Sequence, residues 1–366
     1  SYVNLFSFDN AGTFTSTKSQ RVTVSSYGYT DLIKGPGNLF ISAEQGYKRR
    51  DNVNRWGLLV STLSTDGKDD VYVVDTERMT QNVTDNNNSY YRSPSITALN
   101  DSIYAIGYRG FSYDGFIETF KVETSGKITR LKSYEYDVNE SNFNKLVRVD
   151  SNTVAMIYRG FKGQWGGHVL TFDIATDGSS ITEVASKLLH NSGDFFDTDL
   201  IHLRDDMYVA AYKGQAADGY LATLSVSKDG KTIDIKKEFE HEPIQNSYNS
   251  LIKTGPNSVA LAYAGVSDDG FFKTFTISAD GATITEDIKV EHNTTHATHN
   301  ELIQISQNKF ALAYYNQSGH GYIRTLKYND LYTSGRAGEI SSVDVDSDNK
   351  VSVTFGKDVF NTSSGS

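Results

Sequence analysis

The chain has 366 residues, a formal net charge of -10 and a pI near 5.3. This acidic balance argues against a nucleic-acid surface or an anionic membrane as partner, and no run reaches the roughly 18 apolar residues of a membrane helix. The absence of cysteine excludes disulfides, thiolate metal sites and a cysteine nucleophile, and the 12% aromatic content beside 30 glycines indicates a folded chain with many tight turns.

The first predicted element is a strand in the opening segment "SYVNLFSFDNAGTFT", which shows no signal-peptide pattern, so we expect any targeting segment to lie upstream or to have been removed. Similar strands recur down the chain. The segment "RWGLLVSTLSTDG" contains Gly57, and five later copies are separated by 51 or 52 residues, measured at their shared glycine. Seven copies of this strand are therefore present, and these later glycines are Gly115, Gly167, Gly219, Gly270 and Gly321.

Each copy belongs to a group of four short apolar runs separated by turn residues. In one group the runs are "SLIKT", "SVALAYAG", "GFFKTFTIS" and "TITEDIKVE", which alternate with period two and are rich in Val, Ile, Phe and Thr. Four strands per repeat are typical of a propeller blade. The second run carries small residues such as Ala105, Gly107, Ala260 and Ala262, which suit positions where neighbouring sheets converge. A β-solenoid is the alternative, although its repeats are usually shorter.

The N-terminal copy supplies only the third and fourth strands of a blade. Residues 343–356, "VDVDSDNKVSVTFG", resemble residues 146–160 and could supply the missing inner strands. We therefore predict an all-β, seven-bladed β-propeller with four-stranded blades of about 51 residues, in which both termini share one blade and close the ring. Residues 1–337 would form blades one to six and the outer strands of blade seven, and 338–366 its inner strands; alternatively, 338–366 begin an immunoglobulin-like module.

These four-strand blades with a "DG" hairpin resemble the broad YVTN and WD-repeat propeller superfamily of secreted microbial proteins, over essentially the whole chain. The resemblance is to architecture alone. The sequence has no "GH...WD" pair, no kelch double glycine and no strict sialidase Asp-box, because "STDGKDDV" and "SKDGKTID" place Gly directly after Asp. The resemblance therefore implies a fold and transfers no functional residue.

The loops between the second and third strands are the candidate binding face. The tyrosines that begin these loops recur at one position, which favours a structural role for their hydroxyl groups. Glu44 replaces the tyrosine in the first repeat, and its carboxylate could face a cation, a sugar hydroxyl or Arg49 or Arg50. Arg109, Arg159 and Lys213 follow the tyrosine in three successive repeats. They could bind a carboxylate or sulfate of an acidic glycan, or pair with Asp114 and Asp218 in the same loops.

Three aromatic residues lie in the same loops, directly before or close to the loop glycine: Trp56, Tyr113 and Trp165. If exposed, such rings stack on sugars; if buried, they wedge the loop. Residues such as Asp31, Asn144 and Asp199 precede the innermost strands and form an oxygen-rich set that suits Ca²⁺ or ordered water, with strand-end capping as the simpler interpretation. We predict no other cofactor, and no metal ligands or catalytic residues, because no catalytic motif is present.

The sequence thus favours an extracellular or cell-surface propeller, microbial in origin, that acts as a non-catalytic binding or adhesion module for a glycan or protein ligand at its loop face. No nucleic acid and no membrane insertion are expected. The alternatives are a structural subunit of an extracellular fibre or layer, which would self-associate, and a glycan-cleaving enzyme.

Overall fold

The computed structural model describes residues 2–8, 14–21, 30–50, 53–65, 71–79, 92–306, 309–316, 320–327, 340–345 and 351–355. They form two compact units. Unit 1 comprises residues 1–7, 14–202 and 225–234, and unit 2 comprises residues 8–13, 203–224 and 235–366. Among the described residues, no helix is long and apolar enough to span a membrane.

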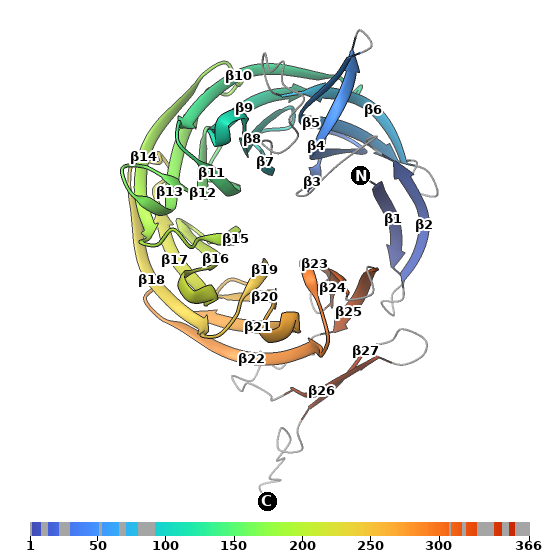
Figure 1. The fold of residues 1–366 in the computed structure, drawn as a ribbon, viewed down its shortest axis with the longest axis vertical. Helices are drawn as coiled ribbons and strands as arrows, with labels where there is room; N and C mark the ends of the chain where they lie inside the picture. The colour runs from blue at the N-terminus through green and yellow to red at the C-terminus, as the bar shows by residue number, and fades with distance from the viewer. Residues whose placement is uncertain are drawn as a thin grey trace, which may run out of the picture. The chain divides into compact units, whose positions relative to one another are not determined.

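The chain forms β-sheets whose strands hydrogen-bond in chain order, as the labels in Figure 1 show. Six of these sheets are blades. The first three are β3 (Thr30–Lys34), β4 (Leu39–Arg50), β5 (Val53–Thr65) and β6 (Val71–Arg78); β7 (Arg92–Ala98), β8 (Ile103–Arg109), β9 (Gly115–Val122) and β10 (Ile128–Asp137); and β11 (Ser141–Arg148), β12 (Thr153–Phe161), β13 (Trp165–Ile174) and β14 (Ile181–His190).

The remaining three blades follow the same order. They are β15 (Phe196–Arg204), β16 (Met207–Lys213), β17 (Gly219–Val226) and β18 (Ile233–Glu242); β19 (Ser247–Gly255), β20 (Ser258–Ala264), β21 (Gly270–Ile277) and β22 (Ile284–Asn293); and β23 (Thr298–Ser306), β24 (Lys309–Tyr315) and β25 (Gly321–Lys327), a sheet with three strands among the described residues. Repeated sheets of consecutive strands are the building units of a β-propeller.

The prediction of seven blades closed by a shared terminal blade is wrong. β1 (Tyr2–Phe8) pairs with β2 (Phe14–Arg21) in one two-stranded sheet, and β26 (Ile340–Val345) pairs with β27 (Val351–Phe355) in another. The segment that we expected to supply inner strands to the N-terminal copy instead folds back on itself, with Val345 opposite Val351. The described residues therefore form a β-propeller of six blades and two separate hairpins.

The second strand of each blade explains the small residues of the repeat. β8 is buried along its whole length. A Cβ atom added to Gly107 would lie 2.4 Å from Cδ1 of Leu146 in the neighbouring sheet, so only glycine permits this approach. Ala105 has no exposed surface. The small residues thus let adjacent sheets of unit 1 pack closely, as the sequence predicted.

A repeated hydrogen bond joins successive sheets and accounts for the threonine and glycine of the repeat. The Thr171 hydroxyl in β13 donates to the Gly230 carbonyl in the β17–β18 hairpin at 2.7 Å. Gly230 has φ +70, a conformation that glycine adopts without strain. The same contact recurs between Thr62 and Gly126, Thr119 and Gly178, and Thr223 and Gly281.

The repeated tyrosines are structural, as predicted. All five are buried: Tyr108, Tyr158, Tyr212, Tyr263 and Tyr314. Most of their hydroxyls bond to a polar side chain at or near the end of an outer strand. The Tyr158 hydroxyl donates to Oδ2 of Asp137 at 2.9 Å and the Tyr263 hydroxyl to Oε2 of Glu242 at 2.8 Å. These bonds satisfy phenols that burial would otherwise leave unpaired.

Candidate functional site

Three loops between second and third strands share one backbone conformation. Each closes with a hydrogen bond of 2.8 Å from a glycine N–H to the carbonyl of an aspartate four residues later. Two adjacent residues in each loop have positive φ, and the second of them is Tyr113 (φ 76), Ala217 (φ 72) or Asp268 (φ 64). The loops therefore present three different side chains from one fixed backbone position.

Tyr113 is the largest of these side chains and is 44% exposed. The guanidinium carbon of Arg109 lies 4.7 Å from the centre of its ring, a cation–π distance. Arg109 itself is buried, and its Nη1 donates a hydrogen bond of 2.8 Å to Oδ1 of Asn142 on β11. A buried arginine thus lies beneath an exposed aromatic ring.

A polar bridge connects this pair to a second arginine. The Asn142 Nδ2 group donates to Oε1 of Glu140 at 2.7 Å, and Nη1 of Arg159 donates to the same oxygen. Nε of Arg159 donates to the Gly193 carbonyl at 2.6 Å. Glu140 therefore links the ends of the neighbouring strands β11 and β12 and balances part of the positive charge, while the Arg109–Asn142 bond joins this sheet to β8.

Arg159 lies against two aromatic rings. Its guanidinium carbon is 5.4 Å from the centre of the Trp165 ring and 5.1 Å from that of Phe196. Trp165 is 42% exposed and meets Phe161 edge-on at 5.5 Å. Arg109, Tyr113, Glu140, Asn142, Arg159, Trp165 and Phe196 together form what we call the arginine–aromatic cluster, which lies entirely in unit 1.

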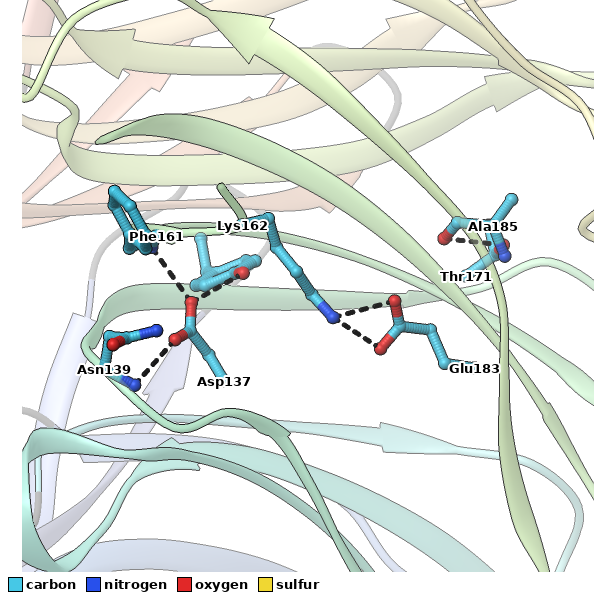
Figure 2. Close-up of polar contacts among 8 residues, drawn as sticks. Asp137, Asn139, Phe161, Lys162, Thr171, Glu183 and Ala185 are labelled. Atoms are coloured by element: carbon cyan, nitrogen blue, oxygen red, sulfur yellow. Dashed lines mark hydrogen bonds and ion pairs between the residues drawn. The ribbon is translucent and has the colours of Figure 1, made fainter. Parts of the chain in front are cut away.

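The buried carboxylate of Asp137 holds the backbone beside the cluster. Its Oδ1 accepts from the Asn139 N–H at 2.9 Å and its Oδ2 from the Phe161 N–H at 2.9 Å, as Figure 2 shows. Nζ of Lys162 forms an ion pair of 2.9 Å with Glu183 in the same region. The two bonds to Asp137 fix the backbone at Asn139, which precedes Glu140, and at Phe161, which lies opposite Trp165 in the β12–β13 pairing. The cluster is therefore preorganised.

The loop carboxylate of Asp114 has an altered acidity. Burial, together with the nearby carboxylate of Glu135 and a hydrogen bond to it, raises the pKa of Asp114 to about 6. Asp114 directly follows Tyr113. The local charge next to the exposed ring therefore changes between mildly acidic and neutral pH.

The structure brings together four of the seven predicted site residues: Arg109, Tyr113, Arg159 and Trp165. Among them, Arg109 donates to Asn142 and Arg159 pairs with Glu140. Glu44 is buried within β4, where it lies opposite Leu59. Lys213 ends β16 in unit 2, and the side chain of Trp56 lies outside the described residues.

The residues before the innermost strands use their oxygens in structural hydrogen bonds. Oδ2 of Asp31 accepts from the Ile96 N–H at 2.7 Å, and Oδ1 of Asn144 accepts from the Tyr136 hydroxyl at 2.7 Å. Oδ1 of Asp199 accepts from the Leu200 N–H at 2.8 Å. Within the described parts of the chain, no group of three or more His, Asp or Glu side chains is arranged to hold a metal ion.

Sequence reasoning missed a second set of aromatic residues. Each of five inner strands begins at a bulge where one residue has positive φ, and three of these residues are aromatic: Phe143 (φ 53), Tyr248 (φ 54) and His299 (φ 54). In unit 2 the Tyr248 and His299 rings stack at 4.3 Å, and His299 meets Tyr315 at 6.2 Å. The repeat spacing marks these positions, but no sequence pattern shows their backbone conformation.

The fold defines a β-propeller protein, and comparison with known proteins supports that class. No family model matches the sequence, and no curated protein matches it. Among solved structures, a candidate 6-phosphogluconolactonase from Bacteroides fragilis is similar with a TM-score of 0.60 and 14% identity, over 89% of this chain and 91% of that one. A mutant of the NanB sialidase from Streptococcus pneumoniae has a TM-score of 0.55 and 9% identity, over 84% and 69%. At these identities the likeness concerns the fold alone.

Proposed function

We propose that this propeller is a non-catalytic carbohydrate-binding protein and that its arginine–aromatic cluster holds the glycan. The observation that carries the proposal is Tyr113, a bulky residue with positive φ whose ring is 44% exposed. Loops of the same backbone carry Ala217 and Asp268 at this position, so the loop does not require an aromatic ring. Since all three loops adopt the positive φ whichever residue they carry, it is the exposed aromatic ring of Tyr113, and not its backbone conformation, that a role at the surface explains.

The chemistry of the cluster suits a sugar. The C–H face of a pyranose stacks on an exposed aromatic ring, and Tyr113 and Trp165 provide two such rings. Sugar hydroxyls both donate and accept hydrogen bonds, and the Arg159–Glu140 ion pair offers a donor and an acceptor side by side. Because Glu140 offsets part of the arginine charge, the cluster favours a neutral or weakly acidic glycan over a strongly anionic one.

Two further observations support the proposal. The carboxylates of Asp137 and Glu140 are both occupied by hydrogen bonds from protein donors, which favours binding over acid–base catalysis. One protein with a similar fold is named a sialidase, so the fold accommodates glycan ligands elsewhere.

The proposal includes an extracellular or cell-surface location, which the seven Asn-x-Ser/Thr sequences of the chain favour.

The test is a glycan array followed by titration of the best ligand. We expect Tyr113→Ala and Trp165→Ala each to weaken binding by about tenfold, since each removes a stacking face. Val266→Ala removes a comparably exposed side chain from a loop of the same type and should leave the affinity unchanged. Failure of the unmodified protein to bind any glycan, or equal binding by all three variants, contradicts the proposal. Cleavage of the bound glycan contradicts its non-catalytic part.

A further inference from the structure

Unit 1 contains a cavity of about 780 Å³ at the turns that join β3 to β4, β7 to β8 and β9 to β10. β8 begins at Ile103 beside this cavity and ends at Arg109 in the arginine–aromatic cluster. The cavity therefore lies at the opposite end of this sheet from the cluster, and nothing in the proposed function uses it.

Tyr104 lines the cavity with a hydroxyl that has no hydrogen-bond partner among the described residues. The residue is only 2% exposed, and its ring stacks on Phe120 at 5.6 Å. Burial, with the nearby carboxylate of Asp101, raises the pKa of Tyr104 above its usual 10, so the phenol keeps its proton at neutral pH. The ring of Tyr104 is thus held in place by packing, and its hydroxyl, which opens onto the cavity, can donate to or accept from a ligand.

Two lysines contribute to the same wall. Lys34 and Lys121 form no ion pair with any residue in the described part of the chain, although Nζ of Lys34 lies 4.7 Å from the centre of the Phe40 ring. Asp101 and Glu123 also line the cavity. The wall therefore combines two cations, two carboxylates and a phenol, and its formal charges balance.

The turns that form the wall are fixed by their own hydrogen bonds. The Gly35 N–H donates to the Leu39 carbonyl at 2.9 Å, which closes the β3–β4 turn. Oδ1 of Asn100 accepts from the N–H groups of Ser102 at 3.0 Å and Ile103 at 2.9 Å, which closes the β7–β8 turn. Because the wall is formed without a ligand, binding would require little reorganisation.

We propose that this cavity binds a small hydroxylated monocarboxylate, that is, a sugar acid. The ammonium groups of Lys34 and Lys121 would receive the carboxylate, while the Tyr104 hydroxyl and the Asp101 carboxylate would bond to ligand hydroxyls. A dianion such as phosphate would be repelled by Asp101 and Glu123. The volume lies within the range of sites that hold small molecules and suits a mono- or disaccharide.

The experiment is an NMR titration of the whole chain with D-glucuronate, D-glucose and inorganic phosphate, observed at the backbone amides of residues 35, 37 and 100–102. D-glucuronate should shift these amides and bind at least about fivefold more tightly than the other two probes. Tyr104→Phe keeps the ring and its stacking on Phe120, and should weaken D-glucuronate binding about fivefold to tenfold. Lys121→Gln should have an effect of similar size.

The controls separate this site from the arginine–aromatic cluster. Lys127→Gln changes an exposed lysine of the same β9–β10 hairpin that does not line the cavity, and should leave the affinity unchanged. Trp165→Ala should also leave it unchanged, although it weakens glycan binding at the cluster. The proposal is overturned if D-glucuronate at about 20 mM moves none of these amides, if phosphate binds more tightly, or if Tyr104→Phe binds like the unmodified protein.

Discussion

The hydrogen bond between Thr171 and Gly230 offers a direct test of how the sheets hold together. The Thr171 hydroxyl is fully buried, donates to the Gly230 carbonyl at 2.7 Å and accepts from the Ala185 N–H at 3.1 Å. Thr171→Val keeps the shape of the side chain and removes both bonds. The substitution therefore leaves the buried carbonyl of Gly230 and the partly buried N–H of Ala185 without this partner.

The expected loss follows from those two groups. Leaving one buried donor or acceptor unsatisfied costs about 1 to 3 kcal/mol, and burial of the added methyl group returns part of it. We expect Thr171→Val to lower the free energy of unfolding by about 3 kcal/mol. Urea denaturation followed by circular dichroism measures this change.

Thr274 provides the matched control. It occupies the same position in β21, four residues after the shared glycine, and its buried hydroxyl has no hydrogen-bond partner among the described residues. Thr274→Val should therefore be neutral or stabilise the protein by up to about 1 kcal/mol. If Thr171→Val is neutral, or if both variants lose stability equally, the repeated hydrogen bond does not hold the sheets together and the reasoning is refuted.

Two other predictions concern buried polar groups. Burial and the neighbouring Arg324 lower the pKa of His292 to about 3, so below pH 6.5 the unfolded chain takes up a proton that the folded chain refuses. The free energy of unfolding should therefore fall by about 2 kcal/mol between pH 7 and pH 5 because of this residue. His292→Leu introduces the residue that β14 carries at the equivalent position, Leu189, and the thermal unfolding of this variant should depend less steeply on pH. An identical pH slope for the variant and the unmodified protein would contradict the assignment. Tyr158→Phe removes a buried hydrogen bond to Asp137 and should cost about 2 kcal/mol in urea denaturation, whereas an unchanged midpoint would show that this bond contributes nothing.

The repeat itself could be predicted from the sequence because its residues have local reasons to recur. Alternating apolar residues predicted the strands, and Gly107 and Ala105 predicted close packing of neighbouring sheets. Closure of a seventh blade could not be predicted in the same way. Residues 343–356 resemble an inner-strand pair, but the residue pattern of a hairpin does not show which other strand the hairpin pairs with. In the structure β26 pairs with β27.

The candidate site was predictable only in part. Arg109 and Arg159 stood out because they differ from the repeat, and Tyr113 and Trp165 because they are aromatic residues in the same loops. Asn142 and Glu140 were missed, since they connect the arginines across two sheets and nothing in their own segment marks them. The positive φ of Tyr113 was also invisible, because sequence alone does not show that the loop adopts this conformation.

The central claim is that the arginine–aromatic cluster binds a glycan, and the indole N–H signal of Trp165 tests it most directly. Assigned by its loss in Trp165→Phe, this signal should shift on addition of the best array ligand and saturate at the same concentration as binding measured by calorimetry. A ligand that binds while the Trp165 signal stays unmoved would show that glycan recognition occurs elsewhere and would contradict the account.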